Sequence, residues 1–336
     1  MGSGGGTGTR PRGRLARRWS CQWPRCGLVP VATRVRSTVM AEESWPLGEK
    51  NEATFDSCDE LLTRLMNRGS PNLLYRGQAQ ADWPLTCSLS RCLRDEAKHG
   101  DPNLLELMDS MVQDQRVNRH IEATETRLLR SFMDEAQALG VADLPDDDDR
   151  LGWWELMQHH SAPTRLLDWT RSPFIGLWFA FWHHDEADGD AALWIFDARN
   201  SWINHLKTMA TIETSDWQSF QSGRTWQNRL AQTAIANDEP VPLIINPRVV
   251  VPRVAAQQSV MTLIPNIDAP TSFGHHVFQS VATKVRLKAT WKAEVLRVCD
   301  GLGLNKQSLF RDLDSVGEAL QELTTGRAGR TGDASH

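Results

Sequence analysis

The segment Leu156–Pro173 gathers side chains that can perform acid–base chemistry, ion pairing and hydrogen bonding. It contains two His, two Arg, an Asp, a Gln and two Thr, and it runs directly into the apolar segment Phe174–Trp182. Ionisable groups at the mouth of a buried element are costly unless they are paired. The cluster therefore predicts either a binding or catalytic site or a polar structural network.

A structural interpretation accounts for several of these residues. Asp168 and Arg165 can form a buried ion pair that fixes the start of the apolar segment. Thr170 or Ser172 can cap a helix whose first turn contains Pro173. Both roles are compatible with a site at the same place.

Arg76 and Gly77 form a second candidate motif, far away in the sequence. The apolar run Leu73–Tyr75 predicts a strand that ends at this pair. A planar guanidinium can bind phosphate with two parallel hydrogen bonds, and a glycine permits close approach of the backbone. We therefore predict that Arg76 contacts a ligand.

Composition limits the class of protein. The 336 residues are 40% hydrophobic and 24% charged, which is typical of a soluble globular chain. The net charge of -5 argues against a general nucleic-acid binder, although a local basic groove is compatible with it. No apolar run approaches the roughly 20 residues of a transmembrane helix. The six cysteines show no Cys-x-x-Cys pair, so we expect no zinc or other metal site and a reducing compartment, the cytoplasm.

The ends of the chain differ from its middle. Residues 1–45 are rich in Gly and Arg and have no acidic residue before Glu42, which predicts a disordered leader. This leader can be a transit peptide, a tag, or sequence upstream of a true start at Met40. Residues 324–336 are predicted to be a disordered tail. One domain is expected over residues 50–323.

Hydrophobic periodicity within this domain predicts an α+β fold, with a helical N-terminal half packed on a mixed or antiparallel sheet. Residues 199–240 are expected to be an insertion of short helices. The predicted helices are Phe55–Asn67, Leu104–Val112, Ile121–Leu139, Trp153–His159, Phe174–Trp182, Thr290–Cys299 and Leu313–Leu323. The predicted strands are Leu73–Tyr75, Ala191–Phe196, Leu243–Ile245, Val249–Val251, Val260–Ile264 and Val281–Leu287.

Five sequence motifs together resemble the FRG domain family, named for a (Phe/Tyr)-Arg-Gly motif. They are Tyr75-Arg-Gly-Gln78 with Trp83-Pro-Leu, Ser88-Leu-Ser-Arg91, Gln158–Pro173 with Phe179-Ala180, Pro252–Gln258, and Ser308–Asp314. The resemblance covers about residues 55–320. Ser161, Ser259 and Arg311 depart from the usual family residues at positions that concern turn geometry.

The same layout is similar to that of ADP-ribosyltransferases and implies an NAD-using enzyme with a fold of that kind. By this resemblance Arg76 holds the pyrophosphate of NAD, and Asp168, held by Arg165 or Arg76, stabilises the positive charge that develops on the ribose. His159 is the candidate acid or base near neutral pH. Gln257 stands near the acceptor. The remaining predicted ligand contacts are Gly77, Gln78, Thr164, Arg165, Trp169, Thr170 and Gln258, with Trp169 stacked on nicotinamide or adenine.

A non-catalytic function is the alternative. The third strand of the transferases usually bears an acidic residue or Gln, and the nearest counterpart here is Gln257-Gln258, so no glutamate is identifiable. The same cleft would then bind a nucleotide, a nucleic acid or a protein partner without turnover. Trp169 would be a core residue and His159 a structural group at a helix end. Whether Arg76, Asp168 and Gln257 meet in one cleft is the observation that tests the existence of a site.

Overall fold

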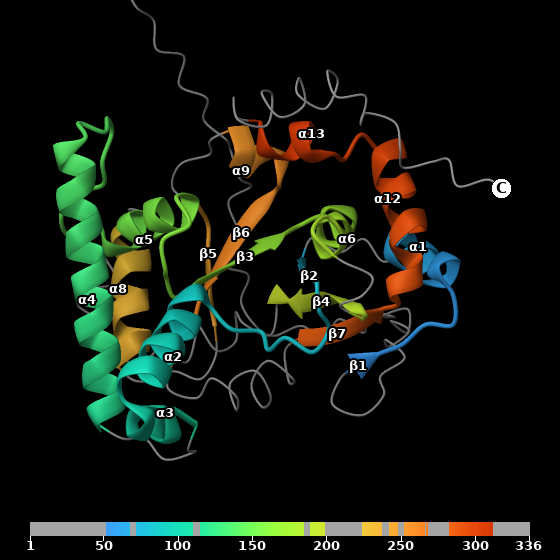
Figure 1. The fold of residues 1–336 in the computed structure, drawn as a ribbon. Helices are drawn as coiled ribbons and strands as arrows, with labels where there is room; N and C mark the ends of the chain where they lie inside the picture. The colour runs from blue at the N-terminus through green and yellow to red at the C-terminus, as the bar shows by residue number, and fades with distance from the viewer. Residues whose placement is uncertain are drawn as a thin grey trace, which may run out of the picture. The chain divides into compact units, whose positions relative to one another are not determined.

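The computed structural model describes residues 52–67, 72–109, 115–184, 189–198, 224–236, 242–247, 252–265, 267 and 282–311. They form an α+β fold around a seven-stranded mixed sheet with the strand order β1-β7-β4-β2-β3-β6-β5 (Figure 1). Neighbouring strands pair antiparallel, apart from the parallel pair β1 and β7. The strands are β1 (Glu52–Ala53), β2 (Leu73–Gln78), β3 (Leu166–Thr170), β4 (Ala191–Asp197), β5 (Leu243–Ile245), β6 (Ser259–Leu263) and β7 (Ala282–Leu287).

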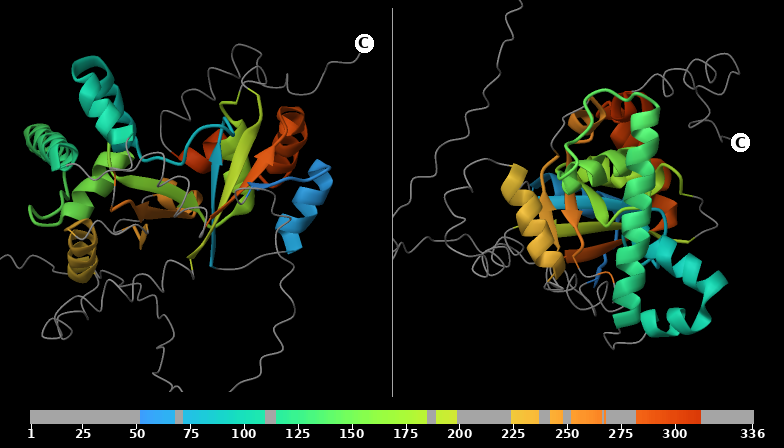
Figure 2. Two further views of the ribbon diagram at one scale, coloured as in Figure 1. Left: turned by 90° about the horizontal axis from the view of Figure 1, so that it is seen from below. Right: turned by 90° about the vertical axis from the view of Figure 1, so that its left-hand side faces the viewer.

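Helices cover both faces of this sheet (Figure 2). The helices and the mixed sheet confirm the predicted α+β class. The described helices are α1 (Cys58–Asn67), α2 (Ser88–Gly100), α3 (Pro102–Asp109), α4 (Gln115–Ala138), α5 (Arg150–His159), α6 (Pro173–Phe181), α8 (Arg224–Ala236), α9 (Pro252–Ala256), the short 3-10 turn η5 (Ala289–Trp291), α12 (Lys292–Gly301) and α13 (Lys306–Phe310).

Side-chain alternation along β2 separates two cores. Leu74 packs with apolar residues of α2, α3 and α4. Its neighbour Tyr75 points to the opposite face and packs with α1, α6 and α12. A third cluster joins α5 and α8 to β5 and β6. The strand β2 thus lies between two apolar layers, and its residues are fixed from both sides.

Local signals in the sequence set the two helices that flank β3. Asp149, the last residue of the acidic run Asp146–Asp149, caps α5 by accepting a hydrogen bond from the Gly152 N–H at 2.9 Å. Ser172 caps α6 by accepting from the Ile175 N–H, with Pro173 in the first turn. The predicted capping of α6 is therefore confirmed for Ser172.

Several predicted elements lie outside the described residues. They are the strand Val249–Val251, the helix Leu313–Leu323, the leader, the tail, and the part of residues 199–240 that precedes α8. Among the described helices, none combines the length and the apolar composition needed to cross a bilayer. The described part of the chain also holds no group of three or more His, Cys, Asp or Glu side chains placed to bind a metal ion.

Candidate functional site

The sheet opens between its central strands β2 and β3. β2 pairs with β4 at six positions but with β3 at a single position, Tyr75 with Thr170. Beyond that point β3 and β6 turn away from β2 and β4 (Figure 2). Across the opening, the Arg76 Nη1 donates to the carbonyl oxygen of Asp168 at 2.8 Å. A side chain therefore bridges the two strands where backbone pairing stops.

A cavity of about 220 Å³ lies at this opening, and we call it the β2–β3 cleft. It brings together Arg76, Asp168 and Gln257, the three residues whose convergence the sequence left open. They come from β2, β3 and the turn between α9 and β6. The lining residues are Tyr75, Arg76, Gly77, Asp168, Trp169, Thr170, Gly176, Phe179, Arg253, Gln257 and Ser259.

Arg76 supplies positive charge at the cleft wall. Its side chain is half-buried, and its Nε is buried without a hydrogen-bond partner among the described residues. Burial lowers the pKa of Arg76, while the Asp168 carboxylate acts in the opposite direction and Arg91 lowers the pKa further. An arginine nevertheless stays protonated in a protein. The unused Nε donor favours an oxygen-rich ligand, since an unsatisfied buried donor costs about 1–3 kcal/mol.

Asp168 is held in place by a chain of hydrogen bonds. The Gln158 Nε2, at the end of α5, donates to the Asp168 Oδ2 at 2.6 Å. The Gln158 Oε1 accepts from the Thr164 hydroxyl, which also accepts from the Leu166 N–H. The Ser88 hydroxyl in turn accepts from the Thr164 N–H at 3.0 Å. Thr164 thus fixes the orientation of the Gln158 amide, and Gln158 fixes the exposed carboxylate of Asp168.

Comparison with known families identifies the central part of the fold. Residues 71–189 match the family model described as the FRG domain. The chain carries an FRG domain. Comparisons with curated proteins and with solved structures gave no match. The matched residues contain β2, α5, β3 and α6, so they hold Arg76 and Asp168, whereas Gln257 reaches the cleft from beyond them.

The structure shows why the FRG motif needs a glycine at position 77, which the sequence alone did not reveal. β2 continues through Gln78 instead of ending at Arg76-Gly77, and α6 crosses directly over Gly77. A Cβ atom at Gly77 would lie 2.1 Å from the Gly176 carbonyl oxygen and 2.3 Å from the Ala180 nitrogen. The glycine is therefore required by helix packing, while its backbone lines the cleft.

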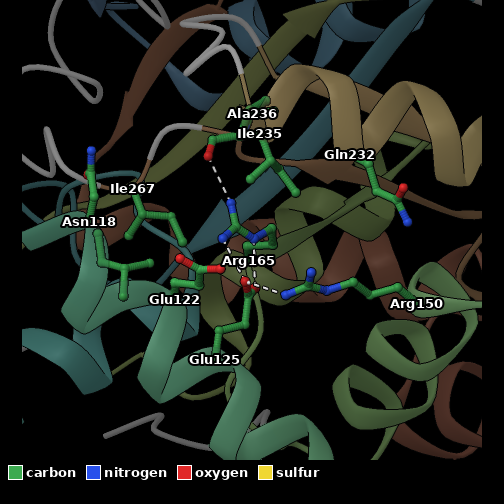
Figure 3. A pocket seen from close by; sticks show the side chains of 11 residues that line it. Asn118, Glu122, Glu125, Arg150, Arg165, Gln232, Ile235, Ala236 and Ile267 are labelled. Carbon is green, nitrogen blue, oxygen red and sulfur yellow. Dashed lines mark hydrogen bonds and ion pairs between the residues drawn. The ribbon is translucent and has the colours of Figure 1, made fainter. Parts of the chain in front are cut away.

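Arg165 points away from the cleft, so the predicted ion pair with Asp168 is wrong. Its Nε and Nη2 donate to the two carboxylate oxygens of Glu125, at 2.7 and 2.8 Å (Figure 3). Its Nη1 donates to the carbonyl oxygens of Ile264 and Pro265. Arg165 therefore ties α4 to β3 and to the segment after β6, and it has no part in the β2–β3 cleft.

Trp169 and Gln78 also direct their side chains elsewhere. The Trp169 ring is buried against Phe196, and its Nε1 donates to the Thr262 hydroxyl at 2.9 Å. Stacking of this ring on a ligand is excluded by that burial, and only the backbone of Trp169 can border the cleft. The Gln78 Oε1 accepts from the Trp194 Nε1. Both side chains therefore make structural contacts to strands beyond the matched residues 71–189.

The remaining predicted residues surround the cleft in different ways. The Thr170 hydroxyl donates to the Gln257 carbonyl oxygen at 2.7 Å and so holds the α9–β6 turn. Gln258 has a positive φ of 48°, and its carbonyl oxygen accepts from the Arg171 N–H. His159 lies exposed at the end of α5 with its ring edge-on to His160. It is not among the residues that line the cleft.

Five residues that line the cleft were not predicted as site residues, namely Tyr75, Gly176, Phe179, Arg253 and Ser259, and the side chains of Arg253 and Phe179 matter most for a ligand. Arg253 lies on α9 four residues before Gln257, and its guanidinium stacks on the Phe310 ring at 4.5 Å. Phe179 projects from α6 and is the aromatic side chain that replaces Trp169 at the cleft. Helical spacing could have placed Arg253 beside Gln257, because residues four apart share a helix face.

Proposed function

We propose that the β2–β3 cleft binds the diphosphate and ribose portion of NAD and that the FRG domain acts as an NAD-dependent ADP-ribosyltransferase-like enzyme. The observation that carries this proposal is a pair of buried side-chain donors in one cleft, the Arg76 Nε and the Gln257 Nε2, for which the described residues offer no hydrogen-bond partner. With Arg253, two guanidinium groups border that cleft. Phosphate oxygens suit such donors because charge-assisted, bidentate contacts to Arg are strong.

The size of the cleft limits what it encloses. Its volume of about 220 Å³ is smaller than most sites that enclose a whole ligand, which have roughly 300–1,000 Å³. We therefore assign to it the diphosphate and the nicotinamide ribose, which contains the reacting C1′ atom. Phe179 lines the cleft and is the aromatic side chain that would contact the nicotinamide ring, and the rest of the ligand would lie along the open side.

Asp168 is the candidate for transition-state stabilisation. In the proposed reaction the bond between nicotinamide and ribose C1′ breaks, and its electron pair leaves with the nicotinamide, which becomes neutral. The ribose then carries positive charge that a nearby carboxylate stabilises. An acceptor nucleophile forms the new bond to C1′ and loses its proton to solvent. Gln158 keeps the carboxylate directed at that position.

Binding without transfer is a second candidate function, and Gln257 favours it. An amide can donate to a phosphate or a hydroxyl but cannot remove a proton from an acceptor. A nucleotide-recognition domain would bind ADP-ribose equally well after Asp168→Asn. Release of nicotinamide from NAD by the wild-type protein, lost in Asp168→Asn, would support the enzyme. Binding with no release above the buffer rate would support recognition alone.

Replacement of Arg76 is the direct test of ligand binding. Arg76→Gln removes the charge that would contact phosphate, so we expect the Kd for ADP-ribose, measured by calorimetry, to rise at least about tenfold. Circular dichroism reports whether the variant is folded. Arg127→Gln is the matched control, because Arg127 is an exposed arginine of α4 paired with Glu96. Failure of the wild-type protein to bind either NAD or ADP-ribose would refute the proposal.

Gln158 is a positioning residue, and its loss should affect turnover more than affinity. Gln158→Leu removes a hydrogen bond to a charged group worth about 1.5–3 kcal/mol, so we expect kcat for nicotinamide release to fall roughly ten- to a hundredfold. The Kd for ADP-ribose should change less than about twofold, well below the tenfold that 1.4 kcal/mol represents. Gln137→Leu, at an exposed position on α4, is the control. Equal losses of kcat and affinity would assign Gln158 a merely structural role.

A further inference from the structure

A second cavity, separate from the β2–β3 cleft, lies between α4, α5, α8 and the segment after β6 (Figure 3). Its volume is about 350 Å³, within the usual range for small-molecule sites of roughly 300–1,000 Å³. Glu125 and Arg165 form its buried floor, and α8 contributes Gln232 and Ile235 to the opposite wall. We call it the α4–α8 pocket.

Arg150 brings an incompletely used positive charge to this pocket. The Glu125 carboxylate already accepts three hydrogen bonds, two from Arg165 and one from the Arg150 Nη2 at 3.2 Å. Two arginines thus share one carboxylate. Among the described residues the Arg150 Nη1 has no hydrogen-bond acceptor, and the side chain is 33% exposed. Its guanidinium stacks on the Trp154 ring at 4.8 Å, which holds its plane in position.

Glu122 brings an unpaired negative charge to the same pocket. It lies one helical turn before Glu125 on α4, so both carboxylates share a helix face. Glu122 is exposed, and the described part of the chain offers it no ion pair or hydrogen bond. In Figure 3 Glu122 and Arg150 reach the Glu125–Arg165 pair from opposite sides. Among the described residues, the pocket therefore presents an arginine that shares its carboxylate partner with Arg165 and a carboxylate, that of Glu122, that has no ion pair.

Aliphatic side chains complete the wall. Ile121 of α4, Ile235 of α8 and Ile267 line the pocket beside these charges. Glu122 would repel a ligand that carries only negative charge, and Arg150 would repel a ligand that carries only positive charge. A ligand with a carboxylate, an ammonium group and an aliphatic body matches all three features.

We propose that the α4–α8 pocket binds a free α-amino acid with an aliphatic side chain. The ligand carboxylate pairs with the Arg150 Nη1, its ammonium group with Glu122, and its side chain packs against the isoleucines. This site is independent of NAD binding, because it shares no lining residue with the β2–β3 cleft.

Three probes of one shape test the assignment by calorimetry on the full chain. They are L-leucine, leucinol, which lacks the carboxylate, and 4-methylpentanoate, which lacks the ammonium group. We expect leucine to bind with a Kd below about 10 mM. The Kd of each truncated probe should be at least roughly tenfold higher. No heat of binding for leucine, or equal binding of all three probes, would overturn the proposal.

Glu122→Gln separates the charge contacts from folding. The side chain is exposed, so the variant should fold as the wild-type protein does. We expect it to weaken leucine binding roughly tenfold while binding of 4-methylpentanoate stays the same or improves. Glu135→Gln, exposed on α4 outside the pocket, is the matched control and should bind leucine normally.

Unchanged leucine affinity in Glu122→Gln would contradict the proposal that Glu122 binds the ammonium group. Arg76→Gln should leave leucine binding intact, which distinguishes a failure here from a failure of the NAD proposal.

Discussion

Gly77→Ala is expected to destabilise the FRG domain by about 3 kcal/mol or more, at the upper end of overpacking effects. The added methyl group would meet the backbone of α6, at 2.1 Å from the Gly176 carbonyl oxygen and 2.3 Å from the Ala180 nitrogen. Backbone atoms in a packed helix cannot rotate away as a side chain can. Either α6 moves off the sheet or β2 distorts, and both changes disturb the core in which Tyr75 packs with α1, α6 and α12.

Two other glycines make this prediction quantitative. At Gly176 the nearest atom to an added Cβ is the Leu193 Cδ1 at 2.8 Å, the tip of a flexible side chain, so Gly176→Ala should cost less. At Gly100, near the end of α2, the space is open, so Gly100→Ala should be neutral or slightly stabilising. Thermal unfolding should rank the variants in this order, with the Tm of Gly77→Ala lower by roughly 6–12 °C. Equal Tm values for Gly77→Ala and Gly100→Ala would show that α6 does not pack closely on β2.

This explanation of Gly77 changes the meaning of the FRG motif. The sequence suggested that the glycine lets a ligand approach, because Leu73–Tyr75 was expected to end there. In the structure, Gly77 is required for the packing of α6 on β2, and Arg76 is the residue of the motif whose side chain can contact a ligand. The partner of Gly77 lies about a hundred residues away in the chain, and no local pattern predicts such a contact.

Strand geometry explains which site residues the sequence could and could not predict. Asp168 and Trp169 are adjacent in β3, and successive side chains of a strand point to opposite faces. The two side chains therefore cannot contact the same ligand. Because Asp168 lines the cleft, the Trp169 side chain points to the opposite, buried face. Arg165 lies three residues before Asp168 and faces the opposite way for the same reason. Its partner Glu125 comes from α4, forty residues earlier, which only the tertiary fold could reveal.

The elements themselves were more predictable than the contacts between them. Ser172 and Pro173 define the start of α6 by local chemistry, and the apolar runs of β4, β5 and β6 give their strands directly. The motifs identified Arg76, Asp168 and Gln257 as candidates but could not show that they meet in one cleft. They meet because β2 and β3 diverge, and the composition of the strands does not predict that divergence.

Glu125→Gln is expected to cost about 3–5 kcal/mol, the range for removing one partner of a buried ion pair. Glu125 and Arg165 have side chains only 5% and 3% exposed, so the remaining guanidinium would keep its charge in a place that water does not reach. The Arg150 side chain would lose its carboxylate partner as well. Chemical denaturation monitored by tryptophan fluorescence measures the change in unfolding free energy.

The exposed pair between Arg127 and Glu96 supplies the control for this prediction. Glu96→Gln breaks an ion pair of 3.1 Å whose side chains are 64% and 43% exposed, so it should change the unfolding free energy by less than about 1 kcal/mol. The double variant Glu125→Leu with Arg165→Met removes both buried charges. It should be more stable than Glu125→Gln, because a buried pair replaced by apolar residues is often neutral. It should not recover completely, since the carbonyl oxygens of Ile264 and Pro265 lose the donor that Arg165 provides. If Glu125→Gln is no less stable than Glu96→Gln, the prediction that the loss of Glu125 leaves Arg165 with a buried, unpaired charge is wrong.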